Sequence, residues 1–100
     1  MAVDLVNAPH LFSELRLRGV TLRNRLVISP MCTYSAVQGG ASDFHLAHYG
    51  RFALGGAGLV MLEATAVGPE ARISYGDLGL WDDGQVEPLA RIVRLVKAQG

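Results

Sequence analysis

The sequence predicts an α/β fold in which residues 1–100 form the N-terminal part of a larger parallel barrel. Two short apolar runs, 25–28 and 59–62, are predicted strands, and the second has the character of a strand buried on both faces, as in parallel sheets. Stretches with helical features follow them at 43–54 and 85–99. Strands that alternate with helices favour a parallel sheet, and two such units alone would leave sheet edges uncovered. We therefore expect one incomplete domain.

A short hairpin is expected before the first strand, over residues 13–24. Leu15 and Leu17 alternate with arginines, which is the period-two pattern of a strand, and Gly19-Val20 would form the turn. The first predicted strand then ends at a proline, which cannot donate a hydrogen bond to a sheet.

The first helix is expected to begin at Ser42, a capping residue, and to end at Gly55-Gly56. Its residues that share one face are Phe44, Ala47, His48 and Phe52. A long loop over 63–84 separates the second strand from the second helix.

The second helix has an apolar stripe and polar residues largely off it. Glu87 precedes Arg91 by four residues, the favourable order for an ion pair within a helix. Asp82 and Asp83 are candidate caps, and Gly100 suits the position just after the helix. The stripe consists of Val86, Leu89, Val93 and Val96.

Composition excludes several classes of protein. Nine basic and nine acidic residues give no net charge, so neither nucleic acid nor a membrane surface is an expected partner. The N-terminus has no signal-peptide pattern, and the longest apolar stretch is too short to span a bilayer. A single cysteine, Cys32, allows no internal disulfide. A cytoplasmic location is expected.

The residues after each predicted strand are candidates for chemistry, because active sites of parallel barrels lie at the carboxyl ends of the strands. Residues 29–35, SPMCTYS, follow the first strand, and residues 63–67, EATAV, follow the second. Position alone leaves alternatives open. Cys32 could be a small buried apolar residue in a turn, and Ala64 could serve tight packing at the rim.

Three segments in combination carry a family resemblance: LRNRLVISPMCTYS at 22–35, DFHLAHYGRFALGGAGLVMLEATAV at 43–67 and ARISYGDLGLWDD at 71–83. In order and spacing the chain resembles the Old Yellow Enzyme family, in its bacterial, thermophilic-like subclass. The resemblance implies a TIM (β/α)8 barrel that holds FMN at its carboxyl mouth. It also implies an oxidoreductase that takes hydride from NADPH or NADH and delivers it from flavin N5 to an activated alkene, such as an enone.

The resemblance also implies roles for particular residues. Cys32 would lie near the reactive edge of the flavin and tune its potential, Tyr34 would contact the substrate, and Ala64 would contact the flavin through its backbone. It implies no role for Thr33. Homodimers or homotetramers are common in this subclass. The residues that would line the flavin are Ser29, Pro30, Met31 and Cys32.

Other groupings have simpler interpretations. His45 and His48 have metal-binding spacing but no evident third ligand, so no metal is expected. The glycines at 55–58 follow a helix instead of opening one, which argues against a dinucleotide-binding loop. Arg72 and Trp81 could anchor an interface or pack locally. Asp77, Asp82 and Asp83 could bind a cation, but capping explains them more simply.

Two rival functions remain from the sequence. One is a truncated, non-catalytic barrel fragment, and the other is a flavin barrel similar to dienoyl-CoA reductases. The resemblance places the flavin-phosphate loops and the substrate-anchoring pair beyond residue 100, so we expect these 100 residues alone to bind FMN weakly or not at all.

Overall fold

The computed structural model describes residues 9–100. Two predictions involve residues outside this range: that the N-terminus has no signal peptide, and that the domain begins at residue 1. In chain order the elements are β1 (Leu15–Leu17), β2 (Val20–Leu22), β3 (Val27–Ile28), α1 (Asp43–Leu54), β4 (Leu59–Val60), β5 (Thr65–Ala66), β6 (Leu78–Gly79) and α2 (Val86–Lys97). Short 3-10 turns lie at His10–Phe12, Pro69–Ala71 and Asp83–Gln85.

The predicted hairpin is confirmed, with its turn one residue earlier than expected. β1 and β2 are antiparallel, and Leu17 pairs with Val20. Val20 therefore belongs to the strand, and the turn residues are Arg18 and Gly19 instead of Gly19-Val20. Arg18 takes a positive φ of 53°, the backbone conformation that tight two-residue hairpin turns use.

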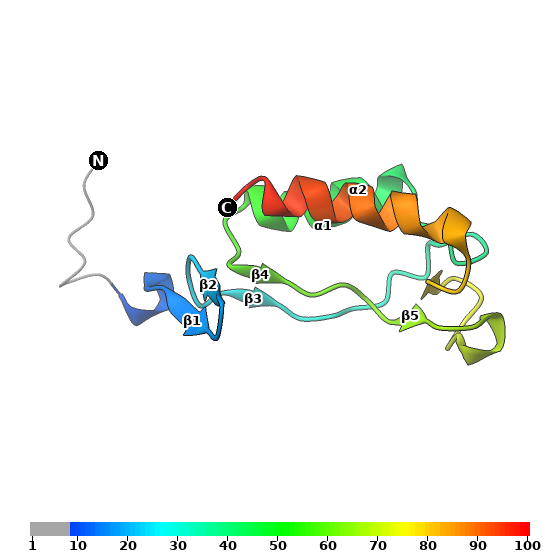
Figure 1. Ribbon diagram of the computed structural model, residues 1–100, viewed down its shortest axis with the longest axis horizontal. Coiled ribbons are helices and arrows are strands. Elements are labelled where there is room, and N and C mark those ends of the chain that lie inside the picture. Colours follow the sequence, from blue (N-terminus) through cyan, green and yellow to red (C-terminus); the bar gives the residue numbers. More distant parts are fainter. Residues whose placement is uncertain (1–8) are drawn as a thin grey trace.

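The centre of the fold is the parallel pair β3–β4, with Val27 opposite Leu59 and Ile28 opposite Val60. Both helices lie over one face of this pair, and the hairpin lies at the end where the strands begin (Figure 1). Strand β5 lies at the opposite end (Figure 1). This is the arrangement that two consecutive β-loop-α units predict.

A second parallel pair, β5–β6, interrupts the stretch 63–84 that the sequence predicts as loop. Thr65 lies opposite Leu78, and Ala66 lies opposite Gly79. Each strand has only two residues, so no periodicity marks it in the sequence. The ring of Trp81 covers this pair, and a Cβ at Gly79 would lie only 2.0 Å from it.

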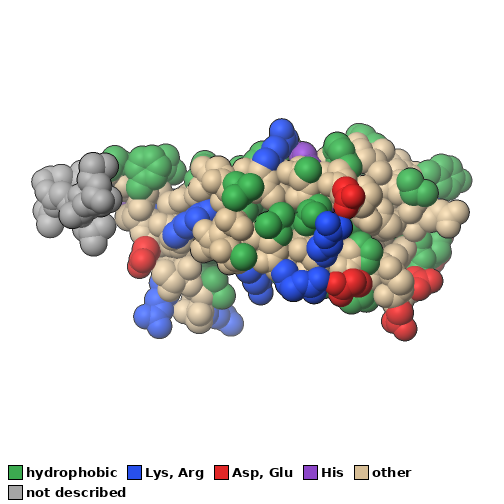
Figure 2. Space-filling model, turned by 90° about the horizontal axis from the view of Figure 1, so that it is seen from above, with side chains coloured by type: hydrophobic (Ala, Val, Ile, Leu, Met, Phe, Trp, Pro, Cys, Tyr) green, Lys and Arg blue, Asp and Glu red, His purple; other side chains and the backbone are tan. Residues whose placement is uncertain are grey.

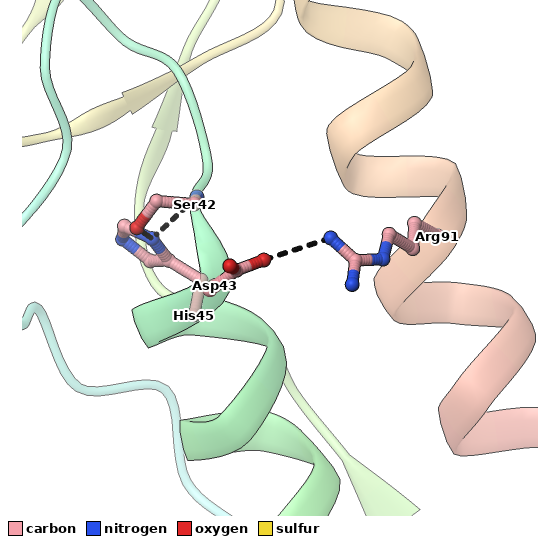
Figure 3. Close-up of polar contacts among 4 residues, drawn as sticks. All are labelled: Ser42, Asp43, His45 and Arg91. Carbon is pink, nitrogen blue, oxygen red and sulfur yellow. Dashed lines mark hydrogen bonds and ion pairs between the residues drawn. The ribbon is translucent and has the colours of Figure 1, made fainter.

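Helix α1 begins and ends as predicted, but a different face is buried. The Ser42 backbone N–H donates to Nδ1 of His45 at 3.1 Å, one half of a capping box (Figure 3). The helix ends where Gly56 takes a φ of +105°. Phe44 and His48 stack on the outer face with ring centroids 5.7 Å apart. The buried residues are His45, Tyr49, Gly50 and Ala53.

The predicted stripe of helix α2 is confirmed only in part. Leu89 and Ile92 are buried and Val96 packs against the core, whereas Val86 and Val93 are exposed. The buried pair packs on Ala36, Tyr49 and Leu78, and this cluster is the hydrophobic core. The predicted and the buried residues both have helical spacing, so the sequence alone does not decide which of them face the core. The position of the sheet decides it.

The predicted Glu87–Arg91 pair is wrong. Arg91 instead reaches Asp43 at the start of α1, with 2.8 Å between Nη1 and Oδ1 (Figure 3). Glu87 pairs with Arg94. Both pairs are exposed, so they contribute little to stability. On the helical side, acidic and basic side chains are interspersed (Figure 2). Among residues 9–100, neither helix is long and apolar enough to cross a membrane.

Arg23, between β2 and β3, ties the ends of both helices together. Its Nη2 donates to the carbonyl oxygen of Ala53 in α1 at 2.8 Å, and its Nη1 donates to that of Gln99 after α2 at 2.5 Å. Its Nε and Nη2 also donate to the Ala57 carbonyl at 3.3 and 3.1 Å. The guanidinium thus satisfies carbonyls at helix C-termini, where a positive charge is also favourable.

We expect Arg23→Lys to lower the free energy of unfolding by about 1–3 kcal/mol, because one ammonium cannot replace these planar, divergent donors. Urea denaturation measures the change. Arg16→Lys is the matched control in the exposed hairpin and should change stability by less than about 0.5 kcal/mol. Equal effects of the two substitutions would show that Arg23 does not fix the helix ends.

Candidate active site

The tips of β3 and β4 lie side by side at the same end of the sheet. Beyond the paired residues, the Met61 N–H donates to the Ile28 carbonyl at 3.2 Å. Further along, Thr33 and Glu63 are joined by hydrogen bonds. The segments 29–34 and 63–66, which the sequence singled out for chemistry, therefore come together in space.

These tips expose an apolar surface edged by backbone donors. Ser29, Pro30 and Ala64 are exposed, Met31 is 54% exposed, and the Cys32 thiol is half-buried. Within residues 9–100, the backbone N–H groups of Cys32 and Ala64 have no acceptor. Such a surface can receive a planar apolar ring whose edge carries hydrogen-bond acceptors.

Tyr34 is held in an unusual backbone conformation at the edge of this surface. Its φ is +54°, which is uncommon for a large side chain, and its side chain is 64% exposed. Gly76 packs directly on its backbone, since a Cβ there would lie 2.6 Å from the Tyr34 carbonyl carbon. The Ala36 N–H donates to the Gly76 carbonyl at 2.9 Å. The loop before β6 therefore stabilises the strained position of Tyr34.

Beneath the tips lies a buried carboxylate, Glu63, which is only 3% exposed. Thr33 donates to its Oε1 from both Oγ1 at 3.0 Å and the backbone N–H at 3.3 Å. The Tyr49 hydroxyl donates to Oε2 and accepts from the Glu63 N–H, the latter at 2.9 Å. Glu63 thus joins the two tips to each other and to α1.

Burial and these hydrogen bonds change the protonation of neighbouring groups. Burial, followed by the hydrogen bond to Glu63, raises the pKa of Tyr49 far above its ordinary value, so Tyr49 stays protonated as a donor. Burial also lowers the pKa of His45, although Glu63 opposes this shift and His48 adds to it. His45 is completely buried, and its Nε2 has no hydrogen-bond partner within the described residues.

Sequence reasoning missed the residues of this network. The family resemblance implies no role for Thr33, yet Thr33 makes the contact between the tips. In the sequence Glu63 is only the first residue after the second predicted strand, although an acidic residue directly after an apolar strand is itself a signal. Tyr49 follows His45 by four residues, a spacing that puts both on one helical face.

The other groupings resolve into structural roles. His45 is buried and His48 lies on the outer face of α1, and residues 9–100 contain no cluster of three metal-binding side chains. The Asp77 carboxylate accepts from the backbone N–H groups of Ile73 and Ser74, at 2.7 and 3.3 Å. Asp82 caps the turn before α2 through the Gly84 N–H at 2.9 Å.

The guanidinium of Arg72 lies over the ring of Trp81, 5.4 Å from its centroid. It also lies over the ring of Tyr75, at 5.1 Å. Local packing thus accounts for Arg72 and Trp81. A groove of about 300 Å³ lies away from the tips, beside β4 and α2, and reaches Gly100.

We expect Tyr49→Phe to lower the free energy of unfolding by about 1–3 kcal/mol, because it leaves the buried Glu63 N–H without a partner and removes one of the two donors to Glu63 Oε2. Thermal and urea unfolding measure this loss. Tyr75→Phe removes the same atom from an exposed ring, and its effect should be below about 0.5 kcal/mol. A Tyr49→Phe chain as stable as the original would contradict the role of this hydroxyl.

His45 should make stability fall on mild acidification. Its pKa in the folded chain lies below the ordinary value of 6.5, so the unfolded chain binds the proton first as pH falls. Its contribution is complete above pH 6.5 and is lost as pH falls toward the folded pKa. His45→Gln keeps a capping-box side chain and should flatten the fall in unfolding free energy between about pH 7 and 5. His10→Gln, at an exposed histidine, is the control, and an unchanged slope in His45→Gln would contradict the assignment.

Comparison with known proteins agrees with this geometry. The chain is 60% identical over 85 residues to NADPH dehydrogenase of Listeria monocytogenes, and the matched region covers 83% of this chain and 25% of the relative. It is 53% identical over 89 residues to NADPH dehydrogenase of Bacillus cytotoxicus, covering 87% and 26%. The chain thus spans about a quarter of the length of the curated relatives it matches.

Solved structures confirm the predicted barrel origin of the fold. Morphinone reductase superposes with a TM-score of 0.84 at 32% identity, covering 92% of this chain and 24% of that one. The Old Yellow Enzyme homologue from Zymomonas mobilis gives 0.83 at 29% identity, covering 92% and 26%. The sequence model of the NADH:flavin oxidoreductase / NADH oxidase family matches residues 10–100. The chain therefore belongs to this flavin oxidoreductase family, as its resemblance to Old Yellow Enzyme predicts.

Proposed function

We propose that these residues form the flavin-facing quarter of an FMN-dependent oxidoreductase that uses NADPH, or NADH, to reduce activated alkenes such as enones. The observation that supports the proposal is the meeting of the two strand tips. They present an accessible apolar surface above a buried, fully hydrogen-bonded carboxylate. Because the chain belongs to the flavin oxidoreductase family, we propose FMN as the ligand of that surface.

The residues at the tips fit an isoalloxazine ring. Met31 and Ala64 offer exposed apolar contacts. The N–H groups of Cys32 and Ala64, which have no acceptor among residues 9–100, suit the acceptor atoms on the ring edge. When bound, FMN supplies the hydride chemistry that amino-acid side chains lack. The protein contributes position, hydrogen bonds and exclusion of water.

Each tip residue has a distinct task in this proposal. Cys32 sets the electronics of the ring edge through a polarizable, half-buried sulfur. Tyr34 directs its exposed hydroxyl end toward the substrate from a fixed backbone position. Ser29 and Pro30 line the ring together with Met31. The chain spans about a quarter of the length of its relatives, and we propose that the rest of the barrel supplies most contacts to the small-molecule enone.

The family resemblance supports two further parts of the proposal. We propose a cytoplasmic homodimer or homotetramer, in keeping with a single unpaired cysteine and the absence of a charge bias that would attract nucleic acid or membranes. The alternative is a non-catalytic fragment. The open groove beside β4 favours it for the 100 residues alone, because in a barrel a further strand would cover this position.

A chimera tests the proposal directly. We expect this chain, placed in the NADPH dehydrogenase of Listeria monocytogenes in place of the matching quarter, to give a yellow, FMN-loaded protein that oxidises NADPH with an enone. The Cys32→Ala chimera should keep the flavin and change its reduction potential measurably. Spectroelectrochemistry and steady-state kinetics measure these effects, and Thr21→Ser, on the exposed hairpin away from the tips, is the control.

Two results would count against the proposal. One is a folded chimera without bound flavin, and the other is a Cys32→Ala chimera with an unaltered potential and rate. The isolated chain should bind FMN weakly in a fluorescence titration. A Kd tighter than about 1 μM would show that the tips alone are a complete site.

A further inference from the structure

A single carboxylate lies at the junction of both tips. Glu63 directly precedes Ala64, and its Oε1 accepts from Thr33, which stands between Cys32 and Tyr34. Its Oε2 accepts from the Thr33 hydroxyl at 3.1 Å and from the Tyr49 hydroxyl. The carboxylate therefore holds the backbone on both sides of the proposed flavin surface.

The contacts of Thr33 make it a rigid connection. Its backbone N–H and its hydroxyl both donate to Glu63, so rotation of either the peptide or the side chain would break a hydrogen bond. Its carbonyl accepts from the Ser35 hydroxyl at 2.9 Å. The Thr65 hydroxyl closes the other side by donating to the Glu63 carbonyl at 3.0 Å. The tip at Cys32 is thus immobilised through its neighbour.

We propose that Glu63 is a positioning residue of the redox site, which fixes the backbone at Cys32 relative to Ala64 through Thr33. The proposal rests on the proposed function for its relevance to flavin. The physical claim itself concerns only the tip at Cys32 and can be measured without flavin.

The alternative is that Glu63 merely completes the core. A carboxylate is an expensive core residue, because its burial costs several kcal/mol unless donors surround it. Tyr49 and His45 on α1 are the titratable groups that interact with Glu63 from the helix, and both are buried. A purely structural role would leave the accessibility of Cys32 unaffected when the hydrogen bonds between Thr33 and Glu63 are weakened in a folded chain.

The test is alkylation of Cys32 by iodoacetamide as a function of pH in this chain, which has no other cysteine. The plateau rate at high pH reports the accessibility of the thiol. Glu63→Gln replaces one acceptor oxygen by an amide donor, so the donors of Thr33 and Tyr49 cannot all be satisfied, and the plateau rate should rise about twofold as the tip loosens. Glu70→Gln changes an exposed carboxylate and should leave the plateau rate unchanged.

Variants of Thr33 test the same connection from its other side. Thr33→Val keeps Glu63 but removes the hydroxyl that binds it, so the plateau rate should rise about twofold as the tip loosens. Thr33→Ser restores the hydroxyl and should return the plateau to the original rate. Circular dichroism and thermal unfolding establish which variants are folded.

The inference is overturned if folded Glu63→Gln has the plateau rate of the original chain, or if Glu70→Gln raises that rate equally. Should Glu63→Gln fail to fold, the Thr33 pair decides the question. A folded Thr33→Val chain with an unchanged plateau, or with a raised plateau that Thr33→Ser does not reverse, would exclude the connection through Thr33.

Discussion

The buried carboxylate of Glu63 is the constraint on which the rest of the structure depends. A charge at this depth is tolerated only where donors replace its lost hydration. Tyr49 and Thr33 provide those donors, one from a helix and one from the neighbouring strand tip. Their positions are therefore coupled: α1 must present Tyr49 inward, and the chain after β3 must run beside Glu63. The same requirement that makes the carboxylate tolerable brings the two tips together.

The opposite end of the sheet is organised by a charge of the other sign. Arg23 reaches carbonyls at the C-terminal ends of both helices, near the hairpin and far from the tips. Helix α1 is thus fixed by Tyr49 near its middle and by Arg23 at its end. In parallel barrels, chemistry belongs to the carboxyl ends of the strands and stability to the amino ends. Glu63 organises the carboxyl ends of the strands in this chain, and Arg23 organises the end where the strands begin.

Local rules predicted much of this fold, and long-range contacts account for what they missed. Ser42, Gly55 and the glycine after α2 act within a few residues, so both helices lie close to their predicted bounds. β5 and β6 depend on each other across a long segment, and Arg23 depends on two helix ends that only the tertiary fold brings near. Within the candidate site, residues 29–32 and Ala64 could be predicted, because they follow predicted strands and match motifs of the family. Thr33 was not, because its importance depends on a carboxylate thirty residues along the chain.

The strained backbone at Tyr34 connects the site to the last part of the chain. An αL conformation costs energy for a large residue, so surrounding contacts must hold it. Thr33 holds it on one side through Glu63, and Gly76 holds it on the other, where no larger residue would fit. Gly76 in turn is positioned by a turn that the buried Asp77 carboxylate caps. The direction of the proposed substrate-contacting side chain is therefore set by two buried carboxylates, Glu63 and Asp77. Neither needs to touch the substrate, and a change at either would alter the geometry of Tyr34 before it altered any chemistry.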